Sequence, residues 1–221
     1  MTCPCLQFHD VRYAYANGVQ ALNGVTFEVR GGERVALTGL NGSGKSTLLL
    51  HTNGLLLPQR GKVYVEGLEV CKKNFRQVRQ KVGMVFQNPD DQLFMPTLED
   101  DVAFGPRNMG MSEAEVRRHV DAALEAVGIA GLRSRPPFQL SGGQKRLGAI
   151  ATVLSMNPSI LVMDEPTADL DSEARGRLIS VLSSLRQTLL VATHDVDFVS
   201  QVCNRTLRLD NGIIADCGHG A

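Results

Sequence analysis

The chain has 221 residues, and its 23 lysines and arginines balance its 23 aspartates and glutamates, so the formal net charge is zero. This length suits one domain, because domains run to about 100–200 residues. Neutral charge without a long basic run excludes a large electrostatic surface for nucleic acid. No apolar run approaches the roughly 20 residues of a membrane-spanning helix, and no signal-peptide pattern opens the chain. We therefore expect a soluble, intracellular chain that acts at a membrane only through another subunit.

The five cysteines are odd in number and scattered, which predicts free thiols rather than a disulfide framework. Donor types that suit a soft or borderline metal occur near both ends of the chain: Cys3, Cys5, His9, Cys217 and His219. Their spacing matches no standard zinc finger. Metal binding there stays open beside the alternative that the termini carry incidental thiols.

Along the first part of the chain, alternating apolar and polar residues predict half-exposed strands over 6–15 and 25–29. Asn17-Gly18 supplies the turn between them, so we expect an antiparallel β layer. A short apolar run at 35–37 then predicts a buried strand, and residues 47–51 continue as a helix.

The segment between that strand and helix reads Gly39-Leu40-Asn41-Gly42-Ser43-Gly44-Lys45-Ser46-Thr47, which fits the phosphate-binding loop. Its glycines let backbone N–H groups point at phosphate oxygens in front of a helix N-terminus. Lys45 would place its charge on the outer phosphates, and the Ser46 hydroxyl would bind Mg²⁺. The residues predicted to bind the nucleotide here are Gly39, Asn41, Gly42, Ser43, Gly44, Lys45, Ser46 and Thr47.

Further along, residues 72–81 predict a charged helix, and residues 82–86 predict a buried strand that delivers Gln87 at its end. From about 88 to 156 the pattern becomes helical, with a capping-box-like start at Ser112-Glu113-Ala114-Glu115. The strands 160–163 and 189–193 flank a helix over 172–185. A hairpin around Asn211-Gly212 joins strands 206–209 and 213–215.

The segment Leu140-Ser141-Gly142-Gly143-Gln144 resembles the signature sequence of ATP-binding cassette (ABC) ATPases, and the other motifs of that family follow in order. The run from Ile160 to Thr167 resembles the Walker B strand with its glutamate, Glu165, and Ala168-Asp169-Leu170-Asp171 resembles the D-loop. Gln87 matches the Q-loop glutamine of the family, and His194 matches its switch histidine. Tyr15 matches the aromatic residue that stacks on adenine. The resemblance covers nearly the whole chain.

This resemblance implies an α/β fold of the P-loop NTPase type, with a RecA-like, mostly parallel sheet, an N-terminal antiparallel β subdomain and an inserted α-helical subdomain. It implies one ABC ATPase domain over 1–221. Within it, 1–87 would hold the antiparallel layer and the first part of the core. The helical signature subdomain would occupy 88–156, and 157–221 would complete the core.

The resemblance also assigns ATP and Mg²⁺ as ligands and ATP hydrolysis as the activity. Glu165 would act as the base for the attacking water, with Lys45, Gln87 and His194 completing the catalytic set, and Ser46, Gln87 and Asp164 would hold Mg²⁺. Three alternatives stand beside these roles. Glu165 would instead cap a helix, His194 would be a satisfied buried histidine, and Tyr13 would replace Tyr15 as the stacking aromatic.

In the family, the signature binds the γ-phosphate of a nucleotide held by a second chain, so the chain is expected to dimerise with itself or with a sister ATPase and to share two ATP sites. The residues expected to act across that dimer are Ser141, Gly142, Gly143, Gln144 and Asp169. An ordinary turn before a helix is the alternative for the signature.

The segment that starts Gln87-Asn88-Pro89-Asp90-Asp91-Gln92-Leu93-Phe94 closely resembles energy-coupling-factor importers, especially their cobalt/nickel branch. His51 with Asn53-Gly54-Leu55-Leu56 is similar to that group as well. The implied function is that of an ATPase and translocase subunit at the cytoplasmic face of the membrane, peripherally attached. Its implied partners are a transmembrane coupling subunit and a substrate-binding membrane subunit, with no nucleic acid.

The rival function is a soluble ABC ATPase that acts on nucleic acid or the ribosome. A neutral chain without a coiled-coil insertion or a second cassette counts against it. A degenerate cassette is disfavoured because Gln87, Glu165 and His194 are all present. The sequence leaves open whether the cargo is cobalt, nickel or a vitamin, whether the dimer contains one or two kinds of chain, and which membrane subunits take part.

Overall fold

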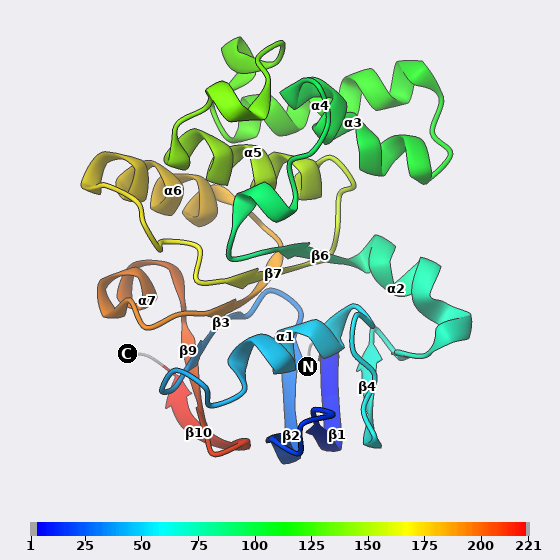
Figure 1. Cartoon of the computed structure of the whole chain (residues 1–221), viewed down its shortest axis with the longest axis vertical. Helices are drawn as coiled ribbons and strands as arrows, with labels where there is room; N and C mark the ends of the chain where they lie inside the picture. The colour runs from blue at the N-terminus through cyan, green and yellow to red at the C-terminus, as the bar shows by residue number, and fades with distance from the viewer. Residues whose placement is uncertain (1–3, 220–221) are drawn as a thin grey trace.

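The computed structural model describes residues 4–219, and side chains up to 215. Two sheets form the framework. The first contains four strands in the order β2-β1-β4-β5, and the second contains six in the order β10-β9-β3-β8-β7-β6 (Figure 1). The first sheet is antiparallel, as predicted, with bounds β1 (Pro4–Ala14), β2 (Gln20–Arg30), β4 (Arg60–Val65) and β5 (Leu68–Glu69).

The second sheet is parallel except at one edge, where β10 runs antiparallel to β9. Its strands are β3 (Arg34–Thr38), β6 (Val82–Val85), β7 (Ile160–Asp164), β8 (Thr188–Ala192), β9 (Arg205–Asp210) and β10 (Ile213–His219). Asn211 and Gly212 both have positive φ, at 49° and 72°, which is the turn geometry that a tight two-residue hairpin requires.

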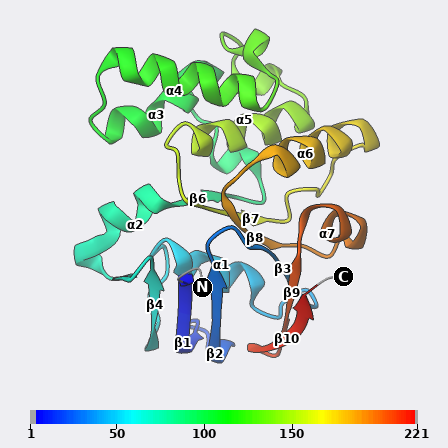
Figure 2. The same cartoon turned by 180° about the vertical axis from the view of Figure 1, so that it is seen from behind.

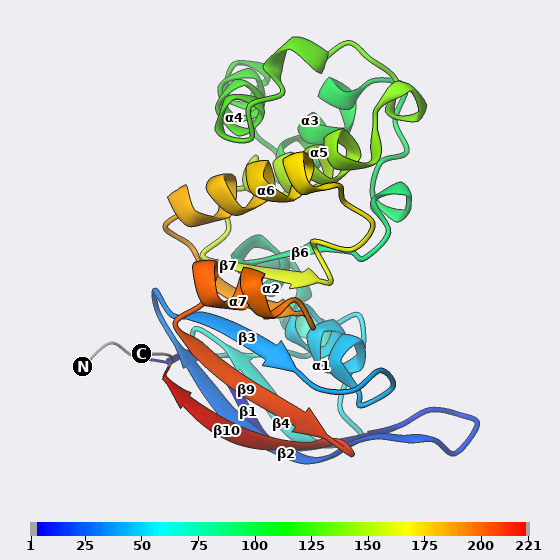
Figure 3. The same cartoon turned by 90° about the vertical axis from the view of Figure 1, so that its left-hand side faces the viewer.

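The strands β7 and β8 are buried throughout and mostly apolar because both faces of the sheet are covered. Successive side chains alternate between faces: Ile160 and Val162 join the core against the antiparallel sheet, whereas Leu161 and Met163 join the core under the helices. Helix α1 (Lys45–Thr52) packs against strands of both sheets and lies between them (Figures 1 and 3).

The other face of the parallel sheet is covered by helices, most of which lie between β6 and β7 in the chain (Figure 2). Their bounds are α3 (Leu98–Asn108), α4 (Glu113–Ala126), α5 (Gly142–Leu154), α6 (Ser172–Ser184) and α7 (Val196–Val202). Helix α2 (Phe75–Lys81) instead contributes Val78 to the core against the antiparallel sheet. Short 3-10 turns occur at Lys72–Asn74, Pro89–Asp91, Ala130–Leu132 and Pro137–Gln139. The capping box predicted at Ser112 and Glu115 is present. Among residues 4–219, no helix is long and apolar enough to span a bilayer.

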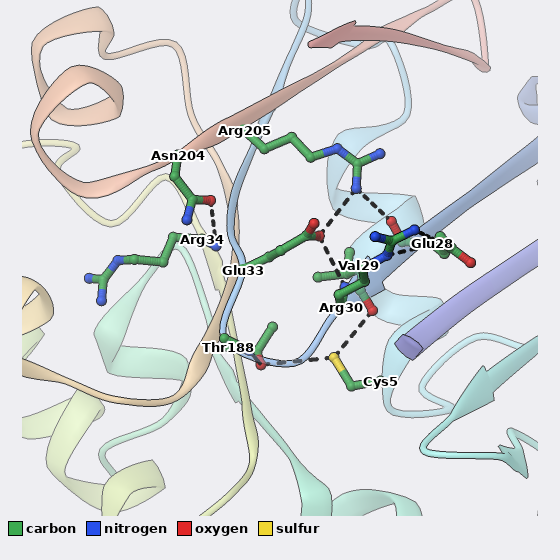
Figure 4. A network of polar contacts seen from close by, with 10 residues as sticks. Cys5, Glu28, Val29, Arg30, Glu33, Arg34, Thr188, Asn204 and Arg205 are labelled. Atoms are coloured by element: carbon green, nitrogen blue, oxygen red, sulfur yellow. Dashed lines mark hydrogen bonds and ion pairs between the residues drawn. The ribbon is translucent and has the colours of Figure 1, made fainter. Parts of the chain in front are cut away.

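A polar network joins the two sheets where β2 leads into β3 (Figure 4). The Arg205 guanidinium donates to the backbone oxygen of Glu28 at 2.9 Å and to the Glu33 carboxylate at 3.2 Å. The Cys5 thiol donates to the Val29 oxygen, and burial raises the pKa of this thiol. The cysteines with described side chains, Cys5, Cys71 and Cys203, form no disulfide, as predicted, and the described residues contain no cluster of three metal-binding side chains. Cys3 lies outside the described residues, as do the side chains of Cys217 and His219.

The strand β6 approaches helix α5 so closely that only glycine fits at position 83. A Cβ atom there would lie 2.1 Å from Cγ1 of Val153 and 2.9 Å from Cγ of Pro158. We predict that Gly83→Ala lowers the free energy of unfolding by about 1–3 kcal/mol, because the helix must shift away from the sheet.

The matched control is Gly176→Ala on the exposed surface of α6, where a Cβ atom meets nothing within 4 Å. This change should raise the free energy of unfolding by about 0.5–1 kcal/mol, since alanine favours helix. Urea unfolding of both variants measures the difference, and equal stability of the two would contradict the packing argument.

Candidate functional site

The phosphate-binding loop lies between β3 and α1, as its sequence context predicts. Gly39 and Gly44 have positive φ, at 145° and 105°. A Cβ atom at Gly39 would lie 2.2 Å from the Leu209 oxygen, and one at Gly44 would lie 2.4 Å from the Ala21 oxygen. Both positions therefore require glycine, for space as well as for backbone conformation.

Lys45 is buried at the start of α1, where its Nζ donates to the backbone oxygens of Gly39 at 2.9 Å and Leu40 at 3.2 Å. An ammonium group has three donors, so one remains for a phosphate oxygen. Oγ of Ser43 is buried in the same loop without a hydrogen-bond partner among the described residues. The loop thus holds a fixed cation and a spare polar atom, which fits a phosphate ligand.

One cavity of about 450 Å³ collects most of the predicted nucleotide and metal residues. Its lining includes Tyr15, Asn41, Gly42, Gly44, Lys45, Ser46, Thr47, Gln87, Asp164 and Glu165. These residues come from the ends of β1, β6 and β7, from the loop before α1 and from the first turn of α1. Segments far apart in the sequence therefore meet at one edge of the parallel sheet, where open α/β sheets bind ligands.

The donors Ser46, Gln87 and Asp164 also line a second cavity of about 480 Å³. Asp164 is buried, and this burial raises the pKa of its carboxyl group with help from the Glu165 charge, whereas the Ser46 hydrogen bond and the Lys45 charge act the other way. A hydroxyl, an amide and a carboxylate are the hard oxygen ligands that Mg²⁺ prefers, so this donor set fits Mg²⁺.

Glu165 follows β7 and adopts a positive φ of 44°, which is unusual for a residue other than glycine. Its backbone N–H donates to the Ala192 oxygen of β8 at 2.8 Å. Oε2 of Glu165 lies 3.0 Å from Nδ1 of His194, whose side chain is mostly exposed. A backbone held in an uncommon conformation beside a polar cavity is a frequent feature of active sites.

The signature segment forms the N-terminus of α5. Ser141 accepts a hydrogen bond from the Gln144 N–H at 3.3 Å, and the Gln144 side chain accepts from the Ser141 N–H at 3.0 Å, so a capping box fixes this end. Ser141 and Gly142 are exposed. Gly143 lets α5 approach α6, because a Cβ atom there would lie 2.6 Å from Cβ of Ala174.

Within one chain, Ser141, Gly143 and Gln144 do not line the described cavity that contains Lys45, and Gly142 lines only the neighbouring one. Asp169 is exposed and also lines that neighbouring cavity. The structure thus brings the phosphate loop, Gln87, Asp164 and Glu165 together but leaves Ser141, Gly143 and Gln144 outside the cavity around Lys45.

Two arginines that the sequence analysis did not single out connect these motifs. Arg146 is buried on α5, and its Nη1 donates to the Phe86 oxygen, next to Gln87, at 2.9 Å. Arg175 on α6 donates twice to Asp195, at 2.8 and 2.7 Å. Both arginines stand a few residues after a recognised motif, but only the fold shows what they contact.

These features define a P-loop nucleotide-binding domain with the motif set of an ATPase cassette. The sequence profile of the ABC transporter family matches residues 22–168. The chain therefore belongs to the ABC transporter family and is an ATPase of that family.

Named relatives and solved structures agree with this assignment. The chain is 52% identical to the ABC transporter ATP-binding protein GSU1281 of Geobacter sulfurreducens, over 96% of this chain and 86% of that protein. It is 47% identical to the energy-coupling factor transporter ATP-binding protein EcfA of Methanothermobacter thermautotrophicus, over 94% of this chain and 68% of that one.

Among solved structures, cbiO1 from Clostridium perfringens, part of the ABC transporter complex cbiONQ, has a TM-score of 0.86 at 38% identity, covering 96% of this chain and 87% of that one. The dimeric post-hydrolysis cassette MJ0796, bound to ADP and Pi, has a TM-score of 0.84 at 28% identity, covering 97% and 100%. The predicted P-loop NTPase fold and the resemblance to energy-coupling-factor ATPases are thereby confirmed.

The ion pair between Arg175 and Asp195 gives a pH-dependent prediction. Its hydrogen bonds to Arg175 hold the pKa of Asp195 well below the usual value, so the pair stabilises the fold above the unfolded pKa of about 3.9 and loses this effect as pH falls further. Asp195→Asn keeps a side chain that caps α7 but removes the charge.

At pH 7 we expect Asp195→Asn to lower the free energy of unfolding by about 1–3 kcal/mol, since hydrogen bonds to a charged group are lost. The deficit should stay constant down to about pH 5 and shrink below about pH 4. Urea unfolding at a series of pH values measures it, and a deficit that grows on acidification would contradict the ion-pair account.

Proposed function

We propose that this chain is the ATP-hydrolysing subunit of an energy-coupling-factor importer, in which ATP-driven closure of a dimer acts on a transmembrane subunit. The observation that carries this proposal is the position of Gln87. It lines the nucleotide cavity, and its neighbours Phe86 and Gln92 line an apolar groove on the protein surface. One short segment therefore connects the ATP site with a surface suited to a partner helix.

The catalytic roles follow from the geometry. Lys45 and the N–H groups of the loop would bind the phosphates, and Ser46, Gln87 and Asp164 would hold Mg²⁺, which would neutralise the charge of the phosphate oxygens. The carboxylate of Glu165 would orient and deprotonate the attacking water, with His194 held beside it at 3.0 Å. Phosphoryl transfer needs mainly such positioning and charge.

The signature supports a site shared between two chains. Its N–H groups at the start of α5 form an exposed anion-binding end that lies outside the cavity around Lys45. In a dimer that end would meet the γ-phosphate bound by the other chain, with Asp169 exposed beside it. ATP would hold two chains together, and hydrolysis would let them part. The dimeric state of a similar cassette supports this arrangement.

The groove proposed to receive the transmembrane subunit encloses about 650 Å³ between α2, α3 and α5. Phe94 is 63% exposed and Phe104 is 45% exposed there, with ring centroids 5.2 Å apart at 85°. Exposed aromatic rings in a groove mark a binding site for an amphipathic helix. Through this contact the chain would sit at the cytoplasmic face of the membrane.

Cobalt or nickel is the cargo that we propose, from the resemblance of the segment after Gln87 to that importer branch. Cargo would be selected by a membrane subunit, so the described residues of this chain do not choose it. Vitamins are the alternative cargo.

The catalytic role of Glu165 is tested by Glu165→Gln. This change keeps the shape of the side chain but removes the base, so we expect Mg-ATP binding to persist while turnover falls by about 10²–10⁴-fold. The variant should accumulate as an ATP-bound dimer by light scattering. Adding Lys45→Ala is the control, because it removes phosphate binding and should return the protein to a monomer. A monomeric Glu165→Gln variant at saturating Mg-ATP would contradict the shared site.

The docking groove is tested by Phe94→Asp, which places a charge in the apolar groove. The tagged variant should lose the polytopic membrane subunit that co-purifies with the wild-type chain from gently solubilised membranes, while basal ATPase activity stays unchanged. Ile213→Asp is the matched control, since Ile213 is 51% exposed but does not line that groove. Mass spectrometry identifies the partners and any bound cobalt or nickel. Exclusively soluble, nucleic-acid or ribosomal partners would favour the rival function.

A further inference from the structure

The exposed aromatic Tyr15 is tied to the phosphate-binding helix by its hydroxyl group. Its oxygen lies 2.8 Å from Oγ1 of Thr47, and 39% of the residue is exposed at the nucleotide cavity. Tyr15 directly follows β1, at the start of the turn that leads into β2, where its backbone N–H donates to Val19. This hairpin projects beyond the rest of the fold (Figure 3).

Two further aromatic rings form a chain of contacts with Tyr15: Tyr13 contacts Tyr15, and His51 contacts Tyr13. The ring of Tyr13 meets Tyr15 edge-on, with centroids 5.2 Å apart at 90°, and meets His51 at 5.0 Å and 78°. Such edge-to-face pairs are the favoured arrangement of aromatic rings. Tyr13 is half-buried and packs on the core under the antiparallel sheet, whereas Tyr15 faces the cavity.

His51 connects Tyr13 to Thr47, the residue that the Tyr15 hydroxyl group contacts. Its Nδ1 lies 2.7 Å from the backbone oxygen of Thr47, one turn earlier on α1. Because a carbonyl only accepts, Nδ1 carries the proton. His51 is completely buried, and burial lowers the pKa of its ring, so the ring stays neutral near pH 7. The contacts therefore run from Tyr15 through Tyr13 and His51 to Thr47, and back to Tyr15.

We propose that Tyr13 and His51 are positioning residues that hold the Tyr15 ring at a fixed place relative to the phosphate loop, and so set the preference for a nucleotide with a planar aromatic base. The inference rests on the proposed stacking role of Tyr15. Fixing both ends of the ligand site before binding reduces the ordering cost of binding, which favours a ligand that fits both. A phosphate chain without a base gains nothing from this arrangement.

The experiment compares the Kd of Mg-ATP with that of Mg-tripolyphosphate, by calorimetry on the full chain. Tyr13→Leu and, independently, His51→Leu should weaken ATP binding about two- to tenfold while the Kd of tripolyphosphate stays unchanged. Tyr13→Phe should keep the wild-type ratio of the tripolyphosphate Kd to the ATP Kd, because phenylalanine retains the aromatic ring that contacts Tyr15. Unchanged tripolyphosphate binding also shows that each variant is folded.

Tyrosine fluorescence gives a second measurement, since the chain has three tyrosines and no tryptophan. Quenching of the emission by ATP should weaken in Tyr13→Leu and persist in Tyr13→Phe. Tyr15→Ala tests the stacking role separately from the positioning role. If this variant keeps the wild-type ratio of the tripolyphosphate Kd to the ATP Kd, Tyr15 does not stack on the base. The positioning inference would be overturned if Tyr15→Ala lowered the preference for ATP over tripolyphosphate but Tyr13→Leu and His51→Leu did not. It would also be overturned if Tyr13→Leu and His51→Leu weakened the binding of ATP and of tripolyphosphate equally.

Discussion

The close approach of the phosphate-binding loop to the backbone of both sheets is the constraint on which the other features depend. Gly39 lies against the Leu209 oxygen of β9, and Gly44 lies against the Ala21 oxygen of β2, with no room for a side chain at either point. The loop therefore keeps one position relative to the parallel sheet, which carries Asp164 and Glu165, and to the antiparallel sheet, which leads to Tyr15. Both ends of a nucleotide would thus meet groups on a rigid framework.

The helices between β6 and β7 are joined to the segment before Gln87 by side-chain hydrogen bonds. Arg146 of α5 binds the Phe86 oxygen, and Gln92 accepts from the Phe86 N–H at 3.2 Å while donating to Ala149 at 2.9 Å. The backbone next to Gln87 is therefore bound on both sides by groups linked to the signature helix. In the proposed cycle, a shift of Gln87 at the nucleotide would reach both the signature and the groove that contains Phe94.

Sequence alone predicted much of this fold, because its signals were local. The alternation in β1, the turn at Asn211-Gly212, the capping box at Ser112 and the apolar strand before Asp164 all fix their own structure. Helix α7 was not predicted, and the role of its cap, Asp195, became clear only with its partner Arg175.

The residues that line the candidate cavity could be located from sequence in part. Motif spacing identified Lys45, Gln87, Asp164 and Glu165, which the structure brings to one cavity, whereas their catalytic roles stay proposals. The choice between Tyr13 and Tyr15 needed burial, because both are aromatic residues at the end of one strand. Contacts such as that of Arg146 with Phe86 join residues 60 positions apart, and no local pattern encodes them.

The central claim is that one ATP site is built from two chains, and the structure of the Glu165→Gln variant with bound Mg-ATP tests it most directly. The account predicts that the γ-phosphate contacts Lys45 of one chain and Ser141 to Gly143 of the other. A nucleotide contacted by Lys45 and Ser141 of the same chain, or by one chain alone, would contradict it.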